Sequence, residues 1–169
     1  MKLKNIYFTL IVSSFFFLSS AAQQSPDKSL VKVYGEVKKP LNLSLDDLSK
    51  MKRVDASLKD HDGKVQTYTG VAVQDILAEA GAPMGKELRG ENLAKYLLVK
   101  CADGYQVVIA LAEIDNGFTD NVIILADGVS GQPLPKEKGP FRLIVPGEKR
   151  PARSSYQVIE MEVKSASQN

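Results

Sequence analysis

YTGVAVQDILAEAG, residues 68–81, is the stretch of the sequence in which a strand-like run passes into a helix. Its apolar residues at 73, 76, 77 and 80 recur with helical spacing, and Gly81 followed by Pro83 gives a helix stop. Immediately upstream, two strand-like runs flank Asp62-Gly63, a dipeptide that favours a hairpin turn. These signals predict a β-hairpin that leads directly into a short helix.

Strand signals dominate the rest of the sequence. Ser44, followed by acidic residues, is typical of a helix start, and another short helix is expected over 111–115. Residues 84–94 and the Gly- and Pro-rich segment 128–140 are expected to be irregular. The fold class is therefore α+β, mainly mixed β-sheet, with two or three short helices. Runs rich in apolar, aromatic and β-branched residues predict strands over residues 30–37, 54–58, 64–68, 96–99, 105–109, 122–126, 141–145 and 156–163.

The first 22 residues have the order of a secretory signal peptide. Lys2 and Lys4 precede an apolar run, and small residues then lead to a cleavage site after Ala22. The apolar run is shorter than the roughly 20 residues of a membrane-spanning helix, and an uncleaved anchor is the alternative. We therefore expect a periplasmic or secreted protein: signal peptide 1–22, loose leader 23–29, one domain at 30–164 and a tail at 165–169.

Charge argues against two classes of partner. Removal of residues 1–22 takes away two lysines and leaves 20 basic and 20 acidic residues. A chain without net charge has no electrostatic basis for binding nucleic acid or an anionic membrane surface. The expected partners are a small ligand or an exported redox protein.

Six groups of short motifs resemble, in order, the sulfite-oxidase-type molybdopterin-binding domain. The resemblance implies a core of mixed β-sheet with short helices, and its implied activity is that of a molybdopterin-dependent oxidoreductase. No single motif is specific, but together they cover nearly all of the expected mature chain. The motifs are GEVKKPL (35–41) with LSLDDL (43–48), YTGVAVQDIL (68–77) with AG (80–81), ADGY (102–105), LADG (125–128), GQPL (131–134) and GPFRLIVPG (139–147).

The resemblance also implies where a molybdenum ligand would lie. In the family, a cysteine thiolate before the helix motif binds the metal together with the pterin dithiolene, and soft sulfur suits such a centre. The matching stretch here, residues 54–63, contains no cysteine. The one cysteine, Cys101, follows the helix and excludes an internal disulfide. It can be a metal thiolate or redox thiol, but a buried thiol that packs as a small hydrophobe is favoured.

Two further departures concern size and export. The chain lacks the inserted segments that help to enclose the cofactor in larger family members, and its N-terminus has no Arg-Arg pair of the kind that exports folded cofactor enzymes. The leading hypothesis is an exported, cofactor-free binding or accessory domain. The alternatives are a molybdopterin-dependent oxidoreductase, with Cys101 or another group at the metal, and a subunit that docks on a redox protein.

Arg153, Ser154 and Ser155 are the candidate anion-binding residues. The resemblance places this segment near the pterin phosphate, and arginine with hydroxyl groups suits an oxyanion. The other interpretation is a solvated loop that enters the last strand.

His61 is the only histidine and lies between two aspartates in the predicted hairpin turn. Imidazole and carboxylates can bind a divalent ion, but adjacent turn residues rarely converge on one ion, so a polar turn is favoured. One histidine also gives no support for a Ser-His-Asp or Cys-His catalytic set. Asp103 and Asp127 each precede glycine and are expected to form turns.

Overall fold

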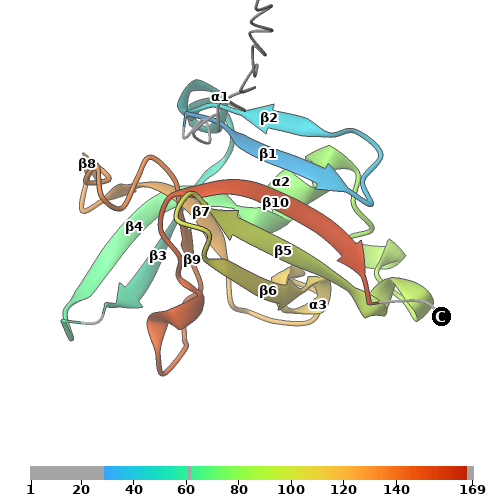
Figure 1. The fold of residues 1–169 in the computed structure, drawn as a ribbon. Coiled ribbons are helices and arrows are strands. Elements are labelled where there is room, and N and C mark those ends of the chain that lie inside the picture. Colours follow the sequence, from blue (N-terminus) through green and yellow to red (C-terminus); the bar gives the residue numbers. More distant parts are fainter. Residues whose placement is uncertain (1–28, 61, 167–169) are drawn as a thin grey trace, which may run out of the picture.

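A computed structural model describes residues 29–60 and 62–166, and within them the chain forms two β-sheets with short helices. One sheet has the strand order β2-β1-β10-β5-β6; the other has β3-β4-β7-β8, with β9 also paired to β7. Figure 1 shows the β3–β4 hairpin extending away from the sheet that contains β10 and β5. The strands are β1 (Val31–Gly35), β2 (Leu41–Leu43), β3 (Arg53–Lys59), β4 (Val65–Ala72), β5 (Lys95–Cys101), β6 (Gln106–Ala110), β7 (Ile124–Val129), β8 (Gln132–Pro133), β9 (Arg142–Ile144) and β10 (Val158–Ser165); the helices are α1 (Leu45–Lys50), α2 (Val73–Ala80) and α3 (Leu111–Ile114), with 3-10 turns at Gly85–Glu87, Gly90–Ala94 and Pro151–Arg153.

The helix α2 forms where the sequence predicts it. The apolar positions 73, 76, 77 and 80 are all buried, and Gly81 ends the helix in the left-handed conformation at φ +74°. The preceding strand is longer than expected: β4 continues to Ala72 because Val71 and Ala72 pair with Leu125 and Ile124 of β7. Backbone pairing to a distant strand therefore decides where the strand ends and the helix begins.

The other local predictions hold in part. Ser44 caps α1 in a reciprocal capping box with Asp47, as the sequence indicates. The first strand ends at Gly35 rather than at residue 37, because the chain turns there at φ +93°. Residues 84–94, expected to be irregular, contain two 3-10 turns, and the segment 128–140 contains the short strand β8.

The two ends of the domain meet in one sheet. The first strand β1 pairs in parallel with the last strand β10, with Val33 opposite Met161. Such a parallel pair joins elements that lie far apart in sequence, so a local sequence pattern does not reveal it. It closes the domain and makes both terminal strands part of one core.

The apolar interior has two parts. The larger cluster joins the first sheet, α2 and one face of the second sheet, and includes Leu77, Leu97 and Leu143. The smaller cluster lies on the opposite face of the second sheet, where Leu58 and Ile144 are buried. Consecutive residues of β9 therefore face different clusters. Leu143 packs into the larger cluster, whereas Ile144 packs into the smaller one, and Arg142 lies on the same face of the strand as Ile144.

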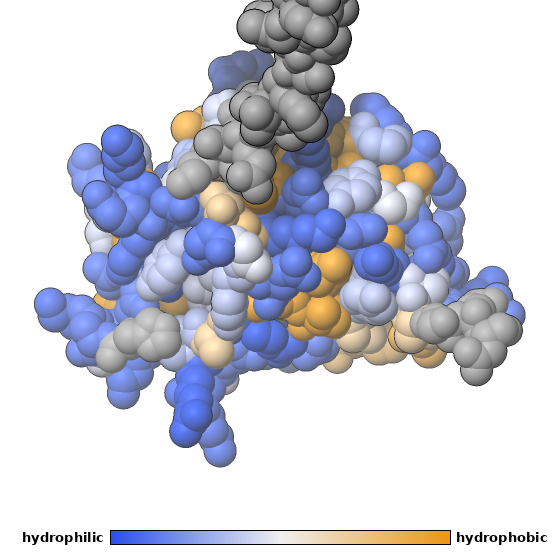
Figure 2. Space-filling model, in the orientation of Figure 1, coloured by the Kyte–Doolittle hydropathy of each residue, from blue (hydrophilic) through white to orange (hydrophobic). Residues whose placement is uncertain are grey.

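The surface drawn in Figure 2 is largely hydrophilic, with an apolar area over β5 and β6. None of the described helices has the length and apolarity to span a membrane. The expected signal peptide, residues 23–28 of the leader, His61 and the last three residues of the tail lie outside the described part of the chain.

Candidate functional site

The stretch in which the resemblance places a metal ligand forms β3 and the start of its hairpin turn. Alternate residues Ala56 and Leu58 face the smaller apolar cluster, and Asp60 follows directly after the strand. The Asp60 side chain is buried, with 7% exposed. The stretch therefore brings a buried carboxylate, and no thiol among its described residues, to this face of the sheet.

Asp60 is the centre of a polar cluster built from three other parts of the chain. Its Oδ2 accepts hydrogen bonds from Arg142 Nη1 and Lys138 Nζ, both at 3.2 Å. Its Oδ1 accepts a 3.3 Å hydrogen bond from the Tyr156 hydroxyl. The Tyr68 hydroxyl lies 3.4 Å from Oδ2 and accepts a hydrogen bond from Arg142. We call Asp60, Tyr68, Lys138, Arg142 and Tyr156 the Arg142 cluster.

Arg142 is fully buried and is only partly satisfied. Its guanidinium carbon lies 4.2 Å from the Tyr156 ring centroid and 4.8 Å from that of Tyr68. Nη1 makes the contacts to Asp60 and Tyr68, whereas Nε and Nη2 are buried and have no hydrogen-bond partner among the described residues. Each unsatisfied buried donor costs about 1–3 kcal/mol, although cation–π contacts with the rings offset part of this.

The electrostatics follow from burial and from the two cations. Burial raises the pKa of the Tyr68 hydroxyl, with Arg142 acting in the opposite direction, so this tyrosine stays protonated at neutral pH. For Lys138, burial acts to lower the pKa, but the hydrogen bond to Asp60 and the neighbouring Tyr156 raise it overall. Lys138 is therefore charged at neutral pH, and Lys138 and Arg142 each have an ion pair with Asp60.

Cys101 lies in the other sheet, on β5 opposite Val158 of β10. It is 3% exposed, and burial raises the pKa of its thiol, with a smaller opposing effect from the Ser155 hydroxyl. That contact falls short of a regular hydrogen bond, since the Ser155 Oγ has no hydrogen-bond partner in the described part of the chain. A thiol of this kind packs as a small apolar group and presents little thiolate at neutral pH.

The predicted anion-binding segment contains a 3-10 turn, and its three residues have different surroundings. The Arg153 guanidinium contacts both Glu113 oxygens at 3.1 Å and the Glu148 Oε1 at 2.6–2.7 Å. The Ser154 hydroxyl is buried and accepts a hydrogen bond from the Val145 N–H at 2.9 Å. Ser155 lies against Cys101. An anion at Arg153 would have to compete with two carboxylates, and its binding there stays a prediction.

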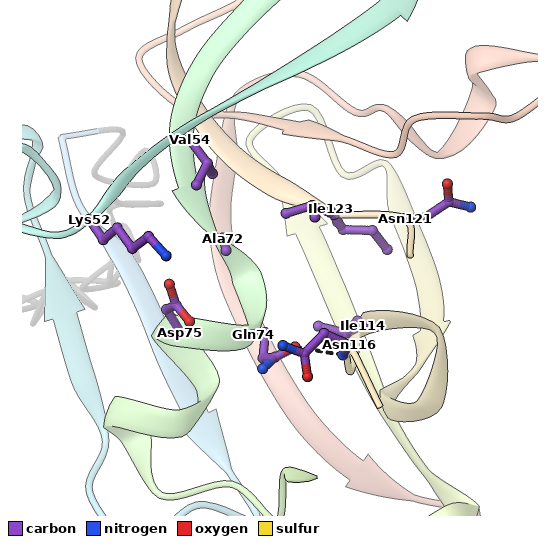
Figure 3. Close-up of a pocket in the computed structure, with 10 residues that line it drawn as sticks. Lys52, Val54, Ala72, Gln74, Asp75, Ile114, Asn116, Asn121 and Ile123 are labelled. Atoms are coloured by element: carbon purple, nitrogen blue, oxygen red, sulfur yellow. Dashed lines mark hydrogen bonds between the residues drawn. The ribbon is translucent and has the colours of Figure 1, made fainter. Parts of the chain in front are cut away.

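Two surface hollows flank the segment between α3 and β7. The first, shown in Figure 3, has a volume of about 160 Å³, and the Lys52 amine and Asp75 carboxylate point toward each other there. Gln74 closes one side by accepting a 2.7 Å hydrogen bond from the Asn116 N–H. The second hollow, of about 320 Å³, contains Arg153. Asn121 and Ile123 line both hollows, so this segment forms the wall between them.

The other acidic candidates have structural contacts. Asp103 and Asp62 accept hydrogen bonds from the N–H groups two residues ahead, as turn-forming aspartates do. Asp127 lies inside β7 and pairs with Arg53, so the expectation of a turn there is wrong. The described residues hold no group of three His, Cys, Asp or Glu side chains arranged for a metal ion.

Most of the Arg142 cluster escapes sequence analysis. Arg142 stands between Phe141 and Leu143 in an apolar run, which is a signal for a buried arginine that needs a partner. Nothing in the sequence identifies Asp60, Lys138 and Tyr156 as its neighbours.

The chain belongs to the oxidoreductase molybdopterin binding domain family, whose model matches residues 19–164. Its fold is similar to that of the sulfane dehydrogenase SoxCD from Paracoccus pantotrophus, with a TM-score of 0.63 and 22% identity over 82% of this chain. The chain spans 40% of that protein. No curated protein matches. These findings confirm the fold class and the predicted family.

The described residues do not fit the family's thiolate-bound molybdenum. The ligand stretch carries Asp60, whose carboxylate is already held by two cations, and Cys101 lies buried in the opposite sheet. Molybdenum in this family takes a soft sulfur ligand, which neither arrangement offers.

Proposed function

We propose that this protein is an exported binding or accessory domain that keeps the fold of the molybdopterin oxidoreductases and works without their cofactor. The observation that carries the proposal is the buried ion pair between Asp60 and Arg142. The pair lies where the resemblance places the metal-bound thiolate. Its two opposite charges neutralise each other without a metal ion.

The position of Cys101 supports the same conclusion. Its thiol is buried among apolar residues of the larger cluster, and its pKa is raised by that burial. A metal-ligating thiolate requires the opposite environment, with nearby positive charge and access to the metal.

The alternative is a molybdopterin-dependent oxidoreductase, and family membership is the observation in its favour. It requires Cys101 or an oxygen ligand such as Asp60 to bind the metal. Replacement of Cys101 with serine separates the two hypotheses: the accessory domain keeps its properties, whereas a thiolate-bound enzyme loses its metal.

The decisive experiment is to measure molybdenum and pterin per mole of the protein, purified from cells that load a family enzyme expressed in parallel. We expect the family enzyme to contain both in near-stoichiometric amounts and this protein to contain neither. Near-stoichiometric molybdenum in this protein would overturn the proposal.

Export is a separate part of the proposal and rests on the order of residues 1–22. Fractionation of the producing cells and mass spectrometry of the purified chain test it together. We expect an extracytoplasmic protein that begins at Gln23. A cytoplasmic chain that retains residues 1–22 would contradict export without bearing on the cofactor.

A further inference from the structure

The Arg142 cluster contains more positive than negative charge. Among the described side chains in direct ionic contact, Asp60 is the one carboxylate, and it faces both Arg142 and Lys138. Buried charges in proteins are normally paired, since an uncompensated charge loses its hydration without replacement. The cluster therefore has the electrostatic character of a site for one further anion.

The unsatisfied atoms of Arg142 define the shape of that anion. Nε and Nη2, which lack partners within residues 29–60 and 62–166, lie on the same edge of the planar guanidinium. This edge presents two parallel N–H groups, a spacing that matches the two oxygens of a carboxylate in a bidentate pair. The opposite edge is already used, because Nη1 donates to Asp60 and Tyr68.

The surrounding residues provide a wall and a point of entry. The Tyr156 ring lies against the guanidinium, 4.2 Å from its centre, and would flank a ligand bound in the guanidinium plane. Lys138 is 38% exposed and Tyr156 is half-buried, whereas Arg142 is fully buried, so the cluster meets solvent at Lys138 and Tyr156. The neighbouring residues Gly139 and Pro140 line a hollow of about 640 Å³.

We propose that the Nε–Nη2 edge of Arg142 binds the carboxylate group of a small ligand, with Lys138 as the second cation at the entrance. The ligand displaces Lys138 on entry, and the amine then closes over it. The proposal deepens the proposed function, on which it rests, because it assigns a ligand class to the site that stands in place of the metal centre.

The test is a titration of the ¹⁵N-labelled protein with sodium acetate and sodium propionate, followed by NMR at the Arg142 Nε–H resonance. Sodium chloride at the same ionic strength is the control for screening. We expect a saturable shift of this resonance with the carboxylates and none with chloride. At ten times Kd, binding should also raise Tm by about 3–6 °C.

Two matched lysine variants locate the site. Lys138→Met removes the cation at the entrance, and we expect it to weaken carboxylate binding about tenfold or more. Lys100→Met is the control, because Lys100 also contacts a carboxylate and a tyrosine but lies on the other sheet. It should change Kd by less than about twofold. Both side chains are partly exposed, so neither variant depends on refilling a buried site.

The outcomes separate this inference from the proposed function. Absence of a saturable Arg142 shift, or equal binding by Lys138→Met and the parent protein, would overturn the carboxylate site. A shift with sulfate but not with acetate would overturn the assignment to carboxylates. Molybdenum in the purified protein would overturn the proposed function, whatever the titration shows.

Discussion

Asp60 and Arg142 lie 82 positions apart in the chain and form an ion pair of 3.2 Å between the end of β3 and the start of β9. Both side chains are buried, and two tyrosines and Lys138 surround them. The pair joins the β3–β4 hairpin to the rest of its sheet. The same ion pair therefore holds the hairpin in place and forms part of the candidate site.

Replacing Asp60 with asparagine tests the ion pair. The neutral amide leaves the buried Arg142 guanidinium without its anion, so we expect the free energy of unfolding to fall by about 3–5 kcal/mol. Urea denaturation measures the change. Asp120→Asn, at an exposed position with the same chemical change, is the control and should stay within about 0.5 kcal/mol. A loss of similar size in both variants would mean that the pair contributes little.

Gly35 should not tolerate a side chain. A Cβ there would lie 2.2 Å from the Val163 carbonyl oxygen, and the residue has a φ of +93°. Gly63 also has a positive φ, +80°, but a Cβ there meets nothing within 4 Å. We expect Gly63→Ala to cost about 1 kcal/mol for the backbone conformation alone, and Gly35→Ala to cost at least about 2 kcal/mol more because β1 must separate from β10. Equal losses in thermal or urea denaturation would show that the strands adjust freely.

The lowered pKa values of Glu160 and Glu162 predict that the stability of the protein decreases at acid pH. The Tyr34 hydroxyl, followed by Lys100, lowers the pKa of Glu160, and Lys100 lowers that of Glu162. A carboxylate whose folded pKa is depressed stabilises the fold above its unfolded pKa, and this contribution is lost as pH falls through the folded value. The free energy of unfolding should therefore decrease from about pH 5 to about pH 3. Glu160→Gln should flatten that decrease in urea titrations, and an unchanged slope would contradict the prediction.

Cys101 should react slowly with thiol reagents in the folded protein. Its 3% exposure and raised pKa both reduce the accessible thiolate at neutral pH. We expect a colorimetric disulfide reagent to modify it at least about a hundredfold faster in denaturant than in the native state. Comparable rates in both states would indicate a reactive thiol and would favour a functional role for Cys101.

Local signals were sufficient for much of the fold. The spacing of apolar residues in 73–80, the cap at Ser44 and the Gly81 stop each act within one or two turns of chain, so they can be read without knowing the neighbours. The end of β4 could not be predicted in the same way, because its pairing with β7 extends the strand beyond residue 68, where the sequence pattern ends it.

The candidate site was much less accessible to sequence analysis. The sequence directed attention to Arg153, whose guanidinium is held by Glu113 and Glu148, and to Cys101, which is buried in the other sheet. The Arg142 cluster went unrecognised, because Asp60 resembled a turn residue and Lys138 a residue of an irregular loop.

The sequence by itself determined the family, the α+β class and the absence of a cysteine from residues 54–63, since these depend on residue identity and order. Only the tertiary structure decided that Asp60, Lys138, Arg142 and Tyr156 meet at one buried point. The pairing of β9 with β7 turns Arg142 to the same face as Asp60, and folding of the segment before β9 brings in Lys138. The meeting of these four residues depends on strand register and on the paths of the loops. Neither can be predicted from the residue types within one short stretch of the chain.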